Sequence, residues 1–104
     1  MATRRIPLTH PGTILREDFI EGLGLTPYKV AKALCVPLPR VNDIVREKRA
    51  ISAEMALMFA RYFGTTDTFF SNLQADYDRR IALAQIEKKL RKIKPYAGSE
   101  TIAA

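Results

Sequence analysis

The chain has 104 residues, with 17 Lys and Arg, 11 Asp and Glu and a formal net charge of +6, and this size predicts one globular domain. Its apolar runs fall far short of the roughly 20 residues that cross a bilayer, and no apolar stretch follows the N-terminal arginines, which predicts a cytoplasmic protein without a membrane partner. One Cys and one His exclude an internal disulfide and a Cys/His zinc site, so no metal site is expected.

Apolar residues recur at helical spacing, and no segment alternates as a strand would, so the sequence predicts an all-α fold of five helices. The first helix follows Pro11 and ends near Gly22 or Gly24. The second is about eight residues long and begins at Thr26 and Pro27, where the hydroxyl serves as N-cap and proline suits the first helical position. Two prolines within residues 36–39 then force a turn before a third helix, which begins at about residue 38 and ends in the segment 46–49.

A fourth helix is expected from residue 53 to about 62, with Ser52 as N-cap, Gly64 as terminator and Leu57 among the side chains available to the core. Thr65 or Thr66 is expected to cap a long fifth helix. Its first part, with apolar residues at 69, 73 and 77, suits docking on the core. Its second part carries apolar residues in an a/d pattern, namely Leu83, Ile86, Leu90 and Ile93.

Residues 27–46 fit a helix-turn-helix motif. Val30 and Leu34 take the inner face of its first helix, small Ala31 lies where the helices cross, and the second helix has apolar residues at 41 and 44. Cys35 occupies the turn position that is usually Gly, where a left-handed conformation costs on the order of 1 kcal/mol. We interpret it as a small, half-buried turn residue, because nothing nearby argues for a redox role beyond the general basic charge.

A helical wheel separates the apolar face of the third helix from a polar face that is free to enter a DNA groove. Arg reads guanine or clamps phosphate, Asn reads adenine, and Asp accepts from cytosine N4. For each single residue, an ordinary exposed polar side chain is an equal alternative. The candidates for base reading are Pro39, Arg40, Asn42, Asp43 and Arg46.

Contacts with the phosphate backbone are expected from residues at the start of the second and fourth helices and from the basic loop after the third. These candidates are Tyr28, Lys29, Lys48, Arg49 and Ser52. Residues 26–49 carry a net charge of +4 and residues 79–104 carry +5, whereas residues 50–78 between them carry −3. Charge blocks of this kind are either a solvated surface or a surface for a polyanion.

Segments outside the motif resemble a known family. The opening His10-Pro11-Gly12, the stretch Phe63-Gly64-Thr65 and the segment 72–78, which reads NLQADYD, are similar to those of the HigA/VapI antitoxins of the XRE helix-turn-helix class, over about residues 8–80. The resemblance implies a lambda-repressor-like domain with a long C-terminal helix. It also implies a bacterial, nucleoid-associated homodimer that binds a palindromic operator, represses its own operon and neutralises a HigB-like ribonuclease toxin, without a cofactor.

Three features depart from this family: Cys35 in the turn, Glu47 where the loop often has Gly, and a basic extension after Arg80. The expected organisation is a DNA-binding domain over residues 1–80, a helical extension over 81–95 and a tail over 96–104, with Pro95 and Gly98 ending the helix. The apolar residues of the extension either form a dimer or toxin interface or pack back on the same subunit.

Two other functions remain open. A stand-alone repressor that has no toxin partner would carry the same DNA-binding residues. An RNA-binding or structural protein would use the basic block at 79–94 and show little preference between operator and random duplex. An enzyme is not expected, since carboxylates such as Asp76 and Asp78 lie about 200° apart around one helix and do not face each other.

Overall fold

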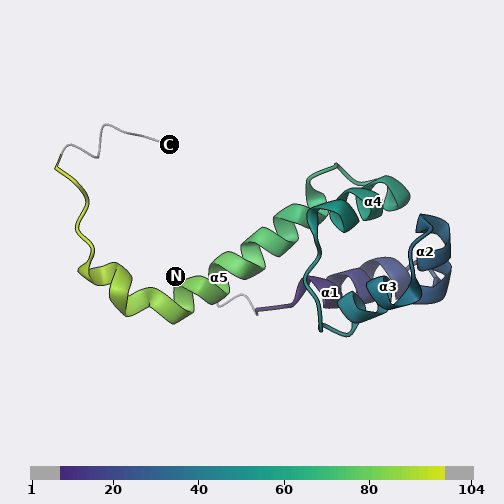
Figure 1. Ribbon diagram of the computed structural model, residues 1–104, viewed down its shortest axis with the longest axis horizontal. Helices are drawn as coiled ribbons and strands as arrows, with labels where there is room; N and C mark the ends of the chain where they lie inside the picture. Colours follow the sequence, from purple (N-terminus) through teal and green to yellow (C-terminus); the bar gives the residue numbers. More distant parts are fainter. Residues whose placement is uncertain (1–7, 98–104) are drawn as a thin grey trace.

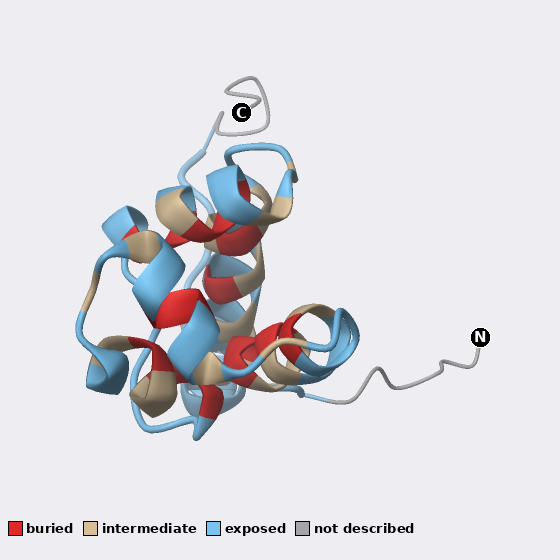
Figure 2. Ribbon diagram, turned by 90° about the vertical axis from the view of Figure 1, so that its right-hand side faces the viewer, coloured by how far each residue is buried: buried red, intermediate tan, exposed pale blue. Residues whose placement is uncertain are grey.

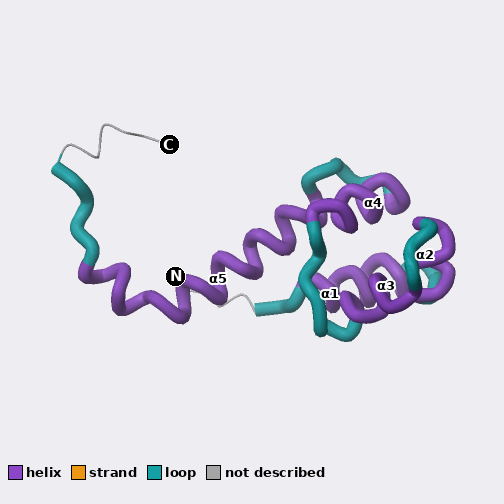
Figure 3. Tube along the Cα trace, viewed as in Figure 1, coloured by secondary structure: helices purple, strands orange, loops and turns teal. Residues whose placement is uncertain are grey.

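The computed structural model describes residues 8–97, and within this range the chain forms helices and connecting loops only (Figure 3). The elements are α1 (Pro11–Ile14), which continues as a π-helical segment η1 (Leu15–Glu21), then α2 (Pro27–Leu34), α3 (Leu38–Val45), α4 (Ala53–Phe63) and α5 (Phe69–Lys92). The five predicted helices and the all-α class are confirmed. The first helix widens into π-type turns, in which the Gly22 amide bonds to the Glu17 carbonyl at 3.0 Å.

Side chains cap α2 and α4 as predicted. The Thr26 hydroxyl accepts from the Lys29 amide, and the Ser52 hydroxyl accepts from the Met55 amide, both at 3.2 Å. The prediction for α5 was wrong by a few residues, because the chain makes a further turn before Phe69 and Thr68 takes the N-cap position.

The core draws buried side chains from every helix, including α2 and α3, and α5 contributes with its first half (Figure 2). Phe59 of α4 and Phe70 of α5 are fully buried, with ring centroids 5.5 Å apart. Phe19 of η1 joins them at 5.1 Å from Phe70. The sequence placed Leu57 among the side chains available to the core, and this was wrong: Leu57 is 55% exposed. It lies on the outer face of α4, between the exposed Glu54 and Arg61 at spacings of three and four residues.

Helix α5 leaves the globule after its first half (Figure 1). Residues 69, 73 and 77 are partly buried, as their spacing predicted, whereas every residue from 82 to 97 is exposed. The helix bends at Ile86, which has φ −114° and ψ 16°, and ends at Lys92, before Pro95; Gly98 lies outside the described residues. Within residues 8–97, no helix is both long and apolar enough to cross a membrane.

The four apolar residues of the a/d pattern lie on this projecting half. Their exposed fractions are 45% for Leu83, 39% for Ile86, 41% for Leu90 and 66% for Ile93. The alternative that they pack back on the same subunit is therefore wrong.

Candidate nucleic-acid interface

Helices α2 and α3 pack on each other as the two halves of a helix-turn-helix motif (Figure 1). Val30 and Ala31 of α2 and Val41 and Ile44 of α3 are buried, which confirms the inner faces assigned from sequence. Burial of these apolar residues leaves the polar face of α3 pointing outward.

The turn between the two helices is built on Cys35, which has φ 58° and ψ 43°. The Val36 amide bonds to the Ala31 carbonyl at 3.0 Å, and the Cys35 amide bonds to the Lys32 carbonyl at 3.1 Å. These two bonds form the helix-ending motif that usually has Gly at the left-handed position. The predicted left-handed conformation of Cys35 is confirmed, whereas the expectation that the residue is half-buried was wrong, because Cys35 is exposed.

The base-reading candidates occupy the outward side of α3. Pro39 and Arg46 are exposed, whereas Arg40, Asn42 and Asp43 are half-buried. Arg40 pairs with Glu54 at 3.6 Å, and Asp43 pairs with Arg49 at 3.5 Å. Arg46 has no ion pair within residues 8–97, so its exposed guanidinium is free to bind a ligand on the outward side of α3.

The phosphate candidates lie in two places beside α3. Tyr28, which is 60% exposed, and Lys29 belong to the first turn of α2. Lys48 and Arg49 are exposed in the loop that follows α3, and Ser52 begins α4. The ion pairs of Asp43 with Arg49 and of Arg40 with Glu54 place the basic loop and the start of α4 beside the polar face of α3. Cations and helix N-termini are the groups that position a protein on the DNA backbone.

The loop after α3 begins with a left-handed residue that is not Gly. Glu47 has φ 63°, its amide bonds to the Ile44 carbonyl at 2.9 Å, and the Lys48 amide bonds to the Asp43 carbonyl at 2.8 Å. The sequence marked Glu47 only as a departure from the family pattern, and the structure adds that its backbone is left-handed.

Three residues of the first helix hold this end of α3, and sequence reasoning did not assign them that role. Gly12 lies so close that a Cβ on it would be 1.9 Å from the Ile44 carbonyl oxygen. The Thr13 hydroxyl donates to Glu47 Oε2 at 2.5 Å, and Arg16 Nη1 donates to the Val45 carbonyl at 2.6 Å. All three lie in the stretch 10–17 that resembles the family, but nothing in that stretch indicates a contact with α3.

His10 precedes these residues and serves as a cap. Its Nδ1 accepts from the Gly12 amide at 2.8 Å, and its ring packs on Tyr77 of α5 with centroids 5.0 Å apart. The single histidine is therefore a capping and packing residue. Within residues 8–97 there is no group of three His, Cys, Asp or Glu side chains that could hold a metal ion.

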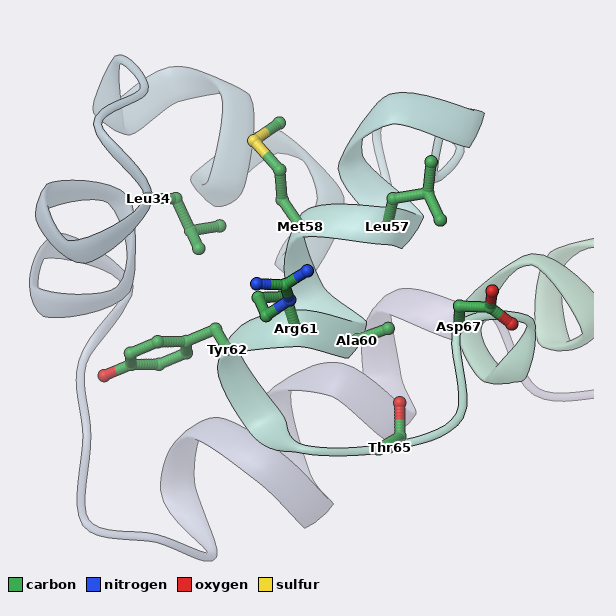
Figure 4. A pocket seen from close by; sticks show the side chains of 8 residues that line it. All are labelled: Leu34, Leu57, Met58, Ala60, Arg61, Tyr62, Thr65 and Asp67. Carbon is green, nitrogen blue, oxygen red and sulfur yellow. The ribbon is translucent and has the colours of Figure 1, made fainter.

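A separate groove of about 570 Å³ opens between the end of α2 and α4 (Figure 4). Leu34 and Met58 form part of its apolar wall, while Arg61 and Asp67 add one charge of each sign. The groove contains none of the residues proposed to contact DNA.

Comparisons with known proteins agree with this geometry. A family model described as helix-turn-helix matches residues 17–70. Virulence-associated protein I of Dichelobacter nodosus is 46% identical over 77 residues, which are 74% of this chain and 71% of that protein. An uncharacterized HTH-type transcriptional regulator, YbaQ of Escherichia coli K12, is 35% identical over 102 residues, or 98% of this chain and 85% of that protein. The solved structure of the Pseudomonas aeruginosa antitoxin HigA with the higBA promoter matches with a TM-score of 0.80 and 44% identity, covering 86% of this chain and 98% of that one.

Proposed function

Because this chain belongs to the helix-turn-helix family of the HigA antitoxins, we propose that it binds a palindromic operator as a homodimer, represses its own operon and neutralises a small HigB-like ribonuclease toxin. The protein would act in the bacterial cytoplasm, on the nucleoid. One observation carries the proposal: the outward face of α3 is polar and has cations and helix N-termini near it. The same chain is 44% identical to an antitoxin whose structure was solved with its promoter.

The roles of the individual side chains follow from their chemistry and exposure. Arg46 and Asn42 are suited to guanine and adenine, while Arg40 and Asp43 would exchange their ion pairs with Glu54 and Arg49 for contacts with bases. Pro39 would pack against a base or sugar at the start of α3. The phosphate contacts would come from five residues: Tyr28, Lys29, Lys48, Arg49 and Ser52.

A dimer is required on energetic grounds. One short recognition helix reads only a few base pairs, at about 1–3 kcal/mol of discrimination each, which is too little to find one operator in a genome. Two copies on a symmetric site double the number of base pairs that are read.

The projecting half of α5 supplies a surface for a second protein chain. Its four exposed apolar residues, Leu83, Ile86, Leu90 and Ile93, form a stripe that would pack against a second copy or against the toxin. In this organisation a DNA-binding domain assigned to residues 1–80 is followed by an extension assigned to 81–95, whose helix ends at Lys92.

A stand-alone repressor is the second candidate, and the relative named as a transcriptional regulator over 98% of this chain favours it. It shares the DNA-binding half of the proposal and differs only in lacking a toxin. Both candidates predict specific binding to duplex DNA.

Two measurements test the proposal. Fluorescence anisotropy compares the affinity of the full chain for the region upstream of its own gene with that for a shuffled duplex at the same salt concentration. We expect a ratio of at least about 1,000, as is typical of operator binding, and equal affinities would reject DNA recognition.

The second measurement is co-expression of the chain with its neighbouring genes, followed by the mass of what co-purifies. A stoichiometric small basic protein that arrests growth when expressed alone supports the antitoxin role. A homodimer that binds its operator without such a partner supports the stand-alone repressor.

A further inference from the structure

The end of the recognition helix is held by side chains that do not belong to the helix-turn-helix motif. We propose that Arg16 and Thr13 are positioning residues for operator recognition: they set the orientation of α3 relative to the DNA without contacting it. The inference rests on the proposed DNA binding and assigns a role to residues outside every set of contacts described for it.

The last four carbonyl groups of α3 show why Arg16 matters. An α-helix leaves its final carbonyls without intrahelical partners. Here the carbonyls of residues 42, 43 and 44 accept from the amides of 46, 48 and 47 at 2.8–3.0 Å. The fourth carbonyl, that of Val45, accepts from Arg16 Nη1 at 2.6 Å. Arg16 thus completes the C-terminal cap of the recognition helix from a different element of the fold.

Thr13 holds the residue that follows the cap. Its hydroxyl donates to Glu47 Oε2 at 2.5 Å, and Glu47 has the left-handed backbone that turns the chain into the basic loop. Since Lys48 and Arg49 come next, this bond also fixes the starting direction of the loop that carries the proposed phosphate contacts.

Gly12 adds a third contact between the first helix and the end of α3. Its buried Cα lies against the Ile44 carbonyl, where a Cβ would be only 1.9 Å from the oxygen, so the first turn of α1 touches the last turn of α3 directly. With a single contact, α3 could tilt about the contact point. The three contacts of the first helix with residues 44, 45 and 47 together prevent this tilt.

The size of the effect follows from the geometry of α3. An eight-residue helix is about 12 Å long, and a tilt of about 10° about its C-terminal end moves its first residue by about 2 Å. A hydrogen bond to a base edge forms only when the donor–acceptor distance falls within a range about 0.5 Å wide. A small tilt therefore breaks base contacts near Arg40 while leaving contacts to the DNA backbone largely in place.

A direct contact of Arg16 with phosphate would have a different signature. Its guanidinium bonds to the Val45 carbonyl and lies 3.4 Å from Glu17, and its side chain is 32% exposed. Loss of a phosphate contact weakens binding to all sequences equally, whereas loss of helix orientation weakens binding to the operator alone.

The test uses the full chain and two duplexes. The first is the sequence that the unaltered chain recovers from a random library, and the second is the same duplex with both half-sites shuffled. Arg16→Met removes the bond to Val45 while keeping the apolar stem, and Thr13→Val removes the bond to Glu47 without a change in charge. Arg61→Met on α4 is the matched control, because it loses the same charge at an exposed arginine away from α3.

The ratio of the two affinities is the readout, measured at a temperature where circular dichroism shows each variant folded. We expect the ratio to fall at least about 10-fold in Arg16→Met, which corresponds to the loss of one base contact, to fall in the same direction in Thr13→Val, and to stay unchanged in Arg61→Met. An unchanged ratio in both test variants, or an equal loss for both duplexes, overturns the inference.

Two further outcomes are decided by the same design. If Arg16→Met does not fold, the neutral Thr13→Val decides alone. If the unaltered chain recovers no preferred sequence from the library, the proposed DNA recognition itself fails, and this result is distinct from an unchanged ratio.

Discussion

Gln74 of α5 accepts a hydrogen bond from the Ile51 amide at 2.8 Å, and its own amide nitrogen donates to Asp78 at 2.9 Å. It is the only buried polar side chain within residues 8–97. Ile51 lies between the basic loop after α3 and the start of α4, so this bond joins α5 to the segment that carries the proposed phosphate contacts. A buried polar group that has its partners both stabilises and specifies the packing around it.

Replacing Gln74 by Leu leaves the buried Ile51 amide without its acceptor. We expect the free energy of unfolding to fall by about 1–3 kcal/mol, the cost of an unsatisfied buried donor. Urea unfolding measures the change. Gln85→Leu, at an exposed position of the same helix, is the control and should change stability by less than about 0.5 kcal/mol. Equal effects of the two substitutions would contradict the importance of the Gln74–Ile51 bond.

Cys35→Gly should stabilise the protein. The left-handed conformation at this turn costs a residue with a Cβ about 1–2 kcal/mol, and part of that gain is offset by the greater freedom of Gly in the unfolded chain. We therefore expect a net increase of about 0.5–1 kcal/mol in the free energy of unfolding. Ala33→Gly, two residues earlier within α2, should change it by a similar amount in the opposite direction. If thermal denaturation shows that both substitutions change the free energy of unfolding in the same direction, this account of the turn is wrong.

Gly12→Ala should be among the most damaging single-methyl additions in the chain. The added Cβ would meet the backbone of Ile44, which cannot move without displacing α3, so we expect a loss of about 3 kcal/mol, the upper end of overpacking costs. At Gly24, which has φ +71° and open space around it, Ala should cost only about 1–2 kcal/mol, through backbone strain alone. Chemical denaturation of both variants gives the comparison, and a milder effect at Gly12 than at Gly24 would show that α1 and α3 are not in tight contact.

Arg46 and Lys48 should differ in how they affect DNA binding. Arg46→Ala removes a proposed base contact and should weaken operator binding by about 1–3 kcal/mol, with a much smaller effect on a shuffled duplex. Lys48→Ala removes a proposed phosphate contact, so it should weaken both duplexes alike and lower the salt slope by about 1. Binding titrations at several salt concentrations separate the two. If the two residues behave in the same way, the division between base and phosphate contacts is wrong.

The apolar stripe of α5 should matter to association and not to folding. Leu83→Glu combined with Leu90→Glu alters exposed positions, so the free energy of unfolding of the monomer should change by less than about 0.5 kcal/mol per site. Sedimentation equilibrium measures the homodimer and co-purification measures the complex with the toxin, and we expect one of these two complexes to be lost. Ala84→Glu with Gln85→Glu adds the same charge next to the stripe and should leave both associations intact. Unchanged dimer and toxin binding in the stripe variant would exclude this surface as an interface.

Much of the fold could be predicted because local chemistry and helical period agree. Thr26 and Ser52 have the side chains that cap helices, and the apolar residues of α2 and α3 repeat at the helical period, so their places followed from the sequence. Leu57 and the start of α5 were mispredicted. Leu57 lies three residues after Glu54 and four before Arg61, on the one polar face of α4, and this spacing could have placed it outside the core. Several threonines before α5 offered equal caps.

The candidate interface divides in the same way. The outward residues of α3 followed from a helical wheel, and Glu47 was marked by its departure from Gly. The contact of Arg16 with the Val45 carbonyl could not be foreseen, because the acceptor is a backbone atom 29 residues away and carries no sequence signal.

Helix α5 is continuous along the chain, but its two halves differ in their stability against local unfolding. Its first half is anchored by Phe70 and Gln74 in the core. Its second half, beyond the bend at Ile86, has its own backbone bonds and the exposed Glu87–Arg91 ion pair, with no buried side chain. Helical segments of fewer than about 12–15 residues are marginal in water without tertiary support. In the free monomer the amides of this second half should therefore exchange with deuterium long before those of the core, and the Lys and Arg side chains there make it the first site for a trypsin-like protease. A partner that covers the stripe would suppress both processes, so the lifetime of the chain would depend on whether it is bound.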